Sequence, residues 1–198
     1  MHSELFPGKD SRFFLTSYPE SHLEGSDMTH GETVIGNVCF IFDKTHKQVL
    51  LLKRAREPMK DLYTGVGGKT EFKESVHESC LREVQEETGL EISNVKLKAV
   101  VKTILKEKNS AWLLFVYTAE AASEKFIECN EGTLNWVSLD QIDSFPLIGF
   151  IQEIFPSVIH TQELLEGIIH HDLYGNVLAK ELHLSALNKR TLRSSSQG

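Results

Sequence analysis

Glutamates are crowded between Gly68 and Leu90, in a segment that reads GKTEFKESVHESCLREVQEETGL. Three of them, Glu83, Glu86 and Glu87, stand three and four residues apart, so on a helix they share one flank. Like charges at these spacings repel by a few tenths of a kcal/mol per pair on an exposed helix, and by more where water is partly excluded. Because several hard oxygen ligands suit Mg²⁺ or Mn²⁺, the cluster predicts a divalent-cation site.

A solvated acidic helix face is the alternative explanation for the same residues. Arg82 can pair with Glu86 one helical turn further on, but one guanidinium cannot neutralise three carboxylates. Charge alone does not separate the two explanations. The bracketing glycines and the spacing of the acids favour the cation site.

The acids need a helix to hold them, and the sequence marks both of its ends. Ser75 followed by Glu78 is a capping box, and Gly89 is a residue that commonly ends a helix in a left-handed turn. These signals predict a helix over residues 75–88. Its apolar stripe repeats every four residues: Val76, Cys80 and Val84.

The segment as a whole resembles the Nudix box, GX5EX7REUXEEXGU, in which U is a bulky apolar residue. Every fixed position is filled: Gly68, Glu74, Arg82, Glu83, Val84, Glu86, Glu87, Gly89 and Leu90. The resemblance implies a metal-dependent pyrophosphohydrolase with an α/β fold, the Nudix-type α/β/α sandwich around a mixed central sheet. It also implies metal ligands and supporting residues in the box. The implied ligands are Glu83, Glu86, Glu87 and the Gly68 carbonyl, with Arg82 and Glu74 orienting them.

The likeness covers residues 31–186, and its two flanks, EGTLNWVSLDQI and GIIHHDLYGNVLAKEL, resemble the MutT-like 8-oxo-dGTP diphosphatase branch. This branch implies cleavage of a nucleoside triphosphate, with 8-oxo-dGTP as the leading candidate, to the monophosphate and pyrophosphate. Two departures bear on the substrate. Thr64 stands where oxidised-purine enzymes of this branch often have Asn, and residues 150–153 read FIQE where some have an acidic pair.

Other functions remain open from the sequence. The substrate of a Nudix enzyme could instead be a nucleotide sugar, ADP-ribose or a triphosphorylated RNA 5′ end. A non-catalytic nucleotide-binding module is a further alternative, although all the box acids are present. Lys and Arg are dispersed and the net charge is −7, which disfavours nucleic acid and favours a small phosphorylated ligand.

Several residues outside the acidic cluster are candidates for the reaction. Glu131 lies on a loop where related enzymes carry an acid that binds metal or deprotonates water, and the alternative is a solvated acid beside Glu128. Arg54 could bind a substrate phosphate, or it could be a surface arginine beside Lys53. The other candidates for substrate binding are Lys69, Tyr63, Thr64 and Gln152. Trp112 and Trp136 each lie in a strand pattern, which favours core positions over base stacking.

The chain has 198 residues, of which 40% are hydrophobic, and this length predicts one domain. We expect an N-terminal extension over residues 1–30, the Nudix domain over 31–186 and a polar tail over 187–198; the sequence leaves the oligomeric state open. There is no apolar run of about 18 residues, and the first residues lack the apolar stretch of a secretory signal. Three unclustered cysteines also favour a reducing compartment. These features predict a soluble, cytoplasmic protein without a membrane partner.

The remaining pattern predicts strands around two helices. Residues 33–44 and 49–55 read as a hairpin, residues 95–105, 112–119 and 133–138 as further strands, and residues 167–184 as a terminal hairpin. A second helix is expected over residues 150–160, interrupted by Pro156.

Overall fold

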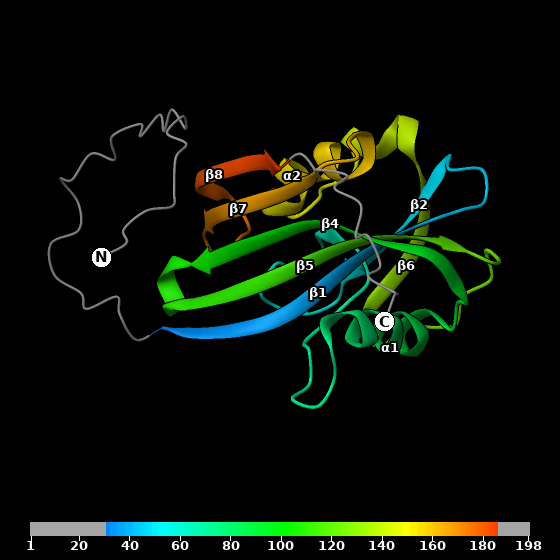
Figure 1. Cartoon of the computed structure of the whole chain (residues 1–198), viewed down its shortest axis with the longest axis horizontal. Coiled ribbons are helices and arrows are strands. Elements are labelled where there is room, and N and C mark those ends of the chain that lie inside the picture. Colours follow the sequence, from blue (N-terminus) through cyan, green and yellow to red (C-terminus); the bar gives the residue numbers. More distant parts are fainter. Residues whose placement is uncertain (1–30, 186–198) are drawn as a thin grey trace, which may run out of the picture. The chain divides into compact units, whose positions relative to one another are not determined.

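The computed structural model describes residues 31–185, which belong to one compact unit, and Figure 1 shows their arrangement. The predictions for residues 1–30 and 187–198 lie outside the described residues. Within residues 31–185, no helix is both long enough and apolar enough to cross a membrane.

Eight strands form one mixed sheet in the order β3-β2-β1-β5-β4-β7-β8, and the eighth strand, β6, also pairs with β2. The pairs β1–β5 and β4–β7 are parallel and the others are antiparallel. The strands are β1 (Glu32–Phe42), β2 (Gln48–Arg54), β3 (Tyr63–Thr64), β4 (Ile92–Leu105), β5 (Ser110–Ala121), β6 (Gly132–Ser138), β7 (Leu164–His171) and β8 (Val177–Ser185). The two α-helices are α1 (Val76–Thr88) and α2 (Gly149–His160), and short 3-10 helices span Lys106–Lys108 and Leu139–Ser144.

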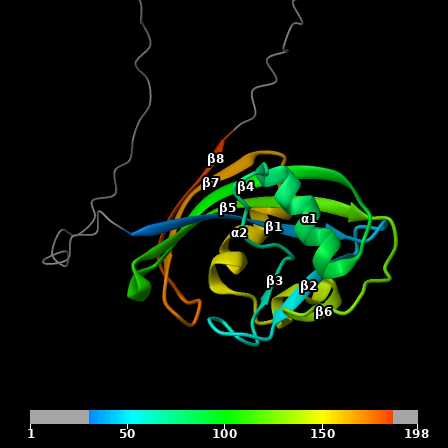
Figure 2. The same ribbon diagram turned by 90° about the horizontal axis from the view of Figure 1, so that it is seen from below.

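The two α-helices cover opposite faces of the sheet (Figures 1 and 2). Alternation along β1 produces the two faces, because successive side chains of a strand point to opposite sides. Phe40 packs in the core beneath α2, where its ring meets Phe155 edge to face at 4.9 Å, whereas Cys39 and Ile41 pack with Cys80 and Val84 of α1. The predicted α/β/α sandwich with a mixed central sheet is therefore confirmed.

Both predicted ends of the first helix are present in α1. The backbone N–H of Glu78 donates to Ser75 Oγ at 3.2 Å, and the Glu78 carboxylate accepts from the Ser75 backbone N–H at 2.8 Å. Gly89 ends the helix with a φ of 67°. Cys80 and Val84 of the predicted stripe are buried, and Val76 is half-buried.

The predicted hairpins are present, and one prediction about the second helix is wrong. The sequence predicts an interruption at Pro156, but α2 continues through it. Pro156 lies on the exposed side of α2. The carbonyl one turn earlier can therefore bond to water when the proline removes a donor, and the helix need not end.

Asp43 organises the turn between β1 and β2, and we expect its loss to destabilise the fold. It is 3% exposed and accepts hydrogen bonds from the backbone N–H groups of Thr45, Lys47 and Gln48. An Asp43→Ala variant removes the buried charged acceptor of these three hydrogen bonds, so the free energy of unfolding should fall by about 2 kcal/mol. Urea denaturation measures the change, with the exposed residue Asp140 as the control in Asp140→Ala. An equal loss in both variants would contradict this role.

Candidate active site

Arg82 is the centre of an ion-pair network on α1. Its Nη2 donates to Glu74 at 2.7 Å, and its Nη1 donates to Glu83 and Glu86, each at 3.0 Å. The guanidinium also donates to the Lys69 carbonyl at 3.1 Å. Hydrogen bonds from Arg82 lower the pKa of Glu74 to about 2. One arginine thus holds three acids of the predicted set and ties α1 to the loop that precedes it.

The glycines before the helix let that loop approach the acids closely. A Cβ at Gly68 would lie 2.6 Å from Glu83 Oε1, so a larger residue would displace the carboxylate. At Gly67, where φ is 147°, a Cβ would lie 2.3 Å from the backbone oxygen of Asn37. Only glycine allows this close approach without a steric clash, which explains why Gly67 and Gly68 are both glycine.

Glu87 is buried and only partly satisfied. The residue is 7% exposed, and its Oε2 accepts one hydrogen bond from the backbone N–H of Gly67 at 3.2 Å. Its Oε1 is buried and has no partner among the described residues. A buried carboxylate oxygen without a donor is costly, so this oxygen requires a proton or a cation.

The electrostatics around Glu87 show that the site holds more negative charge than the protein alone neutralises. Burial, followed by repulsion from Glu131, raises the pKa of Glu87 to about 8. Burial also raises the pKa of Glu83, against the opposing effect of Arg82. Glu131 repels both carboxyl groups, so the structure brings this loop acid to the same site.

The shifted pKa of Glu87 makes the stability of the metal-free protein depend on pH. Since its folded value of about 8 exceeds the ordinary 4.5, the folded protein binds more protons than the unfolded chain between these values. The stabilisation is therefore complete below pH 4.5 and is lost as the pH rises through 8. Thermal melts in chelator should show the melting temperature falling over this range, with a flatter curve for Glu87→Gln. Identical pH profiles would contradict the assignment.

The donor set fits a divalent cation in chemistry, although the acids do not form a ready-made cage. Glu83, Glu87 and the Gly68 carbonyl offer oxygen atoms at the end of the loop, and one buried oxygen lacks a partner. Within residues 31–185, no three His, Cys, Asp or Glu side chains are grouped as a cation site. Glu86 is 60% exposed and paired with Arg82. The assignment of Glu83, Glu86 and Glu87 as metal ligands therefore stays a proposal.

Sequence reasoning missed two buried residues that support the loop. Asn37 of β1 donates from its backbone N–H to the Gly68 carbonyl at 2.9 Å, and its Nδ2 donates to Ser79 Oγ at 2.9 Å. Ser79 Oγ in turn donates to the Lys69 carbonyl at 3.3 Å. The available signal was weak: one polar residue in the apolar run of β1 that reads VIGNVCFIF.

The residues predicted to bind substrate lie on several elements of the fold. Arg54 ends β2 opposite Gly132, next to Glu131, and its Nε donates to the Pro58 carbonyl at 3.2 Å. Lys69 lies within the box, directly after Gly68, and its side chain is exposed. Tyr63 packs edge to face on Phe145 at 5.2 Å.

Within the described residues, no hydrogen bond or ion pair joins the side chains of two further candidates to the acids. Thr64 is 8% exposed in β3, and Gln152 is exposed on α2. Their roles in substrate binding stay predictions. Trp112 and Trp136 pack against the two cores on opposite faces of the sheet, as expected.

The fold, together with the glycine loop and the acidic helix, defines a hydrolase that acts on pyrophosphate bonds. The family model described as "NUDIX domain" matches residues 33–158. The chain therefore belongs to the Nudix family of hydrolases, whose members generally use divalent metal ions.

Known relatives agree with this assignment. An uncharacterized Nudix hydrolase, YvcI of Bacillus subtilis, is 34% identical over 128 residues, which cover 63% of this chain and 79% of YvcI. The MutT protein from Bacillus halodurans is 31% identical with a TM-score of 0.66, covering 75% of this chain and 97% of that protein. The NUDIX domain of Shewanella oneidensis NrtR, solved with ADP ribose, has a TM-score of 0.57 but 16% identity, covering 68% of this chain and 91% of that domain. That likeness shows the fold alone.

Proposed function

We propose that the protein hydrolyses a nucleoside triphosphate, with 8-oxo-dGTP as the leading candidate, to the nucleoside monophosphate and pyrophosphate. The observation that carries the proposal is the buried Glu87 carboxylate with an unpartnered oxygen, beside Glu83 and Glu131. Such a site favours a bound cation, and a bound cation would attract the anionic polyphosphate chain. The similarity to a MutT protein along nearly its whole length supports the choice of substrate class.

The contacts of each residue suggest its role in the proposed reaction. Glu83 and Glu87, with Glu86 and the Gly68 carbonyl, would hold Mg²⁺ or Mn²⁺. When bound, such a cation neutralises phosphate charge and lowers the pKa of the attacking water. Arg82 fixes the orientation of Glu83 and Glu86 and, through Glu74 and the Lys69 carbonyl, the position of the loop.

Glu131 is the proposed acceptor of the proton that the attacking water loses. It is an exposed residue just before β6, yet it is close enough to raise the pKa of Glu87. A carboxylate that faces both solvent and the acidic cluster can take a proton from water and return it to bulk solvent. Arg54, whose strand position lies opposite Gly132, is the proposed contact for a substrate phosphate, and Lys69 is a second one.

A panel of substrates tests the proposal directly. The full chain is incubated with Mg²⁺ and, in turn, 8-oxo-dGTP, dGTP, ADP-ribose, a nucleotide sugar and 5′-triphosphorylated RNA, and the released products are separated and quantified. We expect the highest kcat/KM for 8-oxo-dGTP, with nucleoside monophosphate and pyrophosphate formed in equal amounts. The Glu87→Gln variant, purified in parallel, controls for contaminating phosphatases.

The same panel shows how the proposal would fail. A preference for ADP-ribose or a nucleotide sugar would agree with hydrolase activity but overturn the proposed substrate. Binding of nucleotide without turnover would overturn the catalytic role and support a binding module instead.

We also propose a cytoplasmic location, because Cys39, Cys80 and Cys129 are all free thiols, which suits a reducing compartment.

A further inference from the structure

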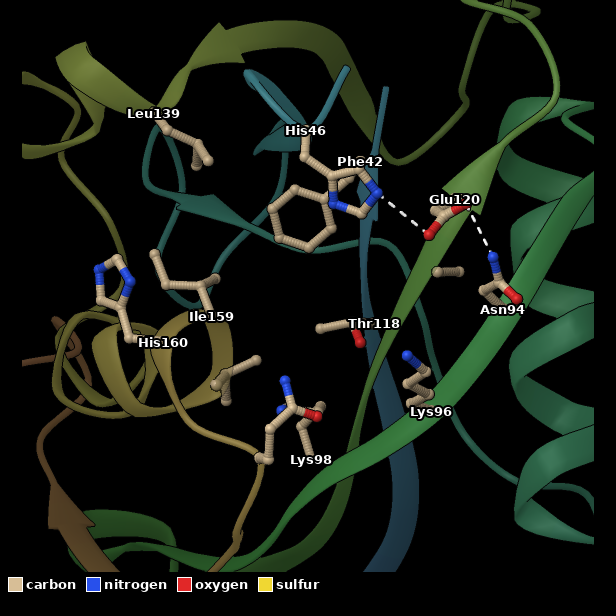
Figure 3. A pocket seen from close by; sticks show the side chains of 13 residues that line it. Phe42, His46, Asn94, Lys96, Lys98, Thr118, Glu120, Leu139, Ile159 and His160 are labelled. Carbon is tan, nitrogen blue, oxygen red and sulfur yellow. Dashed lines mark hydrogen bonds and ion pairs between the residues drawn. The ribbon is translucent and has the colours of Figure 1, made fainter. Parts of the chain in front are cut away.

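A pocket in another part of the domain has no role in the proposed hydrolysis. It opens where the C-terminal end of α2 approaches β4 and β5, and it encloses about 230 Å³ (Figure 3). The start of β6, at Gly132, follows Glu131, while Leu139, just beyond the other end of β6, lines the pocket. A strand of this length spans about 20 Å, so the pocket lies at the opposite end of β6 from Glu131.

Lys98 is the unusual residue of this pocket. It is 8% exposed, and its ammonium donates to the backbone carbonyl of Thr161, the residue that caps the C-terminus of α2. An ammonium has three donors, and none of the ion pairs among residues 31–185 includes Lys98. A lysine that is this buried and unpaired is uncommon, because removing its charge from water is costly.

A bulge in β4 explains why Lys98 points into the pocket. Leu97 lies opposite Tyr117 and Ala99 lies opposite Val116, so Lys98 is an extra residue without a partner on β5. Bulges redirect side chains and are frequent at functional sites. Lys96, two residues earlier, also lines the pocket, and Figure 3 shows both side chains reaching in from β4.

The pocket combines positive charge with an apolar wall. Its one carboxylate among the described lining residues, Glu120, is already engaged: Asn94 Nδ2 donates to it at 2.8 Å, and His46 Nε2 lies 3.0 Å from it. The Asn94 hydrogen bond, and then the charges of His46 and Lys96, lower the pKa of Glu120, so Lys96 already faces one carboxylate. No ion pair among the described residues includes Lys98. Phe42, Val158 and Ile159 supply apolar surface on the side of β1 and α2.

We propose that this pocket binds a small molecule with a phosphate or carboxylate group. Lys98 and Lys96 bind the anionic oxygens through charge-assisted hydrogen bonds, and the apolar wall covers the body of the ligand. Burial, and then the charge of Lys96, lower the pKa of Lys98, and a bound anion relieves both costs. The competing explanation gives Lys98 a structural role alone, as a cation at the C-terminus of α2.

NMR titration of the full chain separates the two explanations. The probes are phenyl phosphate, benzoate and inorganic phosphate, none of which contains a phosphoanhydride bond for the enzyme to cleave. We expect phenyl phosphate or benzoate to shift the backbone amide signals of Thr118 and Ile159 saturably, more tightly than inorganic phosphate does. Whichever of the two binds more tightly identifies the anionic group.

Matched variants keep the test decisive. Lys98→Met should weaken binding by about tenfold or more, because it removes a charged hydrogen bond but keeps the length of the side chain. Lys96→Met, at an exposed position that cannot disrupt the core, should weaken it several-fold, and Lys102→Met, exposed elsewhere on β4, should not change it. Pocket signals that do not saturate would overturn the proposal. So would binding to Lys98→Met and Lys96→Met that is as tight as binding to the original protein. These outcomes are independent of whether the box carboxylates hydrolyse a nucleotide.

Discussion

Replacing Glu87 by glutamine is expected to lower kcat/KM by about three orders of magnitude, while the free energy of unfolding stays the same or increases. The amide keeps the size of the side chain and can still accept from the Gly67 N–H, but it cannot carry the charge that binds a cation. At the same time it removes a carboxylate that burial and Glu131 destabilise in the folded protein. Activity and stability should therefore change in opposite directions.

Steady-state kinetics in Mg²⁺ and urea denaturation in chelator measure the two effects separately. Glu91→Gln is the matched control, because Glu91 is an exposed glutamate just beyond α1 and should tolerate the change in both assays. If the Glu87→Gln variant retained more than a tenth of the activity, or unfolded more easily than the control, the role of Glu87 would be refuted.

The second large effect is expected at Arg82. An Arg82→Met variant should lose about 100-fold in kcat, since Glu83 and Glu86 lose the group that orients them. It should also be less stable, because Glu74, Glu83 and the Lys69 carbonyl lose their donor. This combination distinguishes Arg82 from Glu87, whose replacement should not cost stability.

Arg82→Lys tests whether the planar guanidinium or the charge alone is needed. A lysine keeps one positive charge but cannot reach Glu74, Glu83 and Glu86 at once, so we expect it to recover stability in part and activity very little. Full activity in Arg82→Lys would show that only the charge matters and would contradict the orienting role.

The box helix was predictable in detail because its signals are local. The capping box at Ser75, the end at Gly89 and the buried positions Cys80 and Val84 all lie within a few residues of the bonds they make. The pairing of Arg82 with Glu86 follows from helix geometry in the same way. The order of the strands had no such signal, and the sandwich was predicted from the resemblance to the Nudix family.

What escaped prediction depends on contacts between distant parts of the chain. Asn37 and Ser79 are 42 residues apart in the sequence, and no local pattern in either segment predicts their hydrogen bond. Lys98 enters its pocket because of a bulge in the pairing of β4 with β5, which strand periodicity does not reveal. Pro156 was expected to interrupt α2, and whether it does depends on which side of the helix faces solvent.

We propose that Glu87 and its neighbours hold a dication at the phosphoanhydride. Calorimetric titration of Mn²⁺ or Mg²⁺ into the chelator-treated protein at pH 7, repeated in two buffers with different heats of ionisation, tests it most directly. Because the pKa of Glu87 is about 8 without metal, we predict saturable binding that releases close to one proton per ion, and loss of both signals in Glu87→Gln. Saturable binding of equal strength in Glu87→Gln, or no binding in the original protein, would contradict the claim.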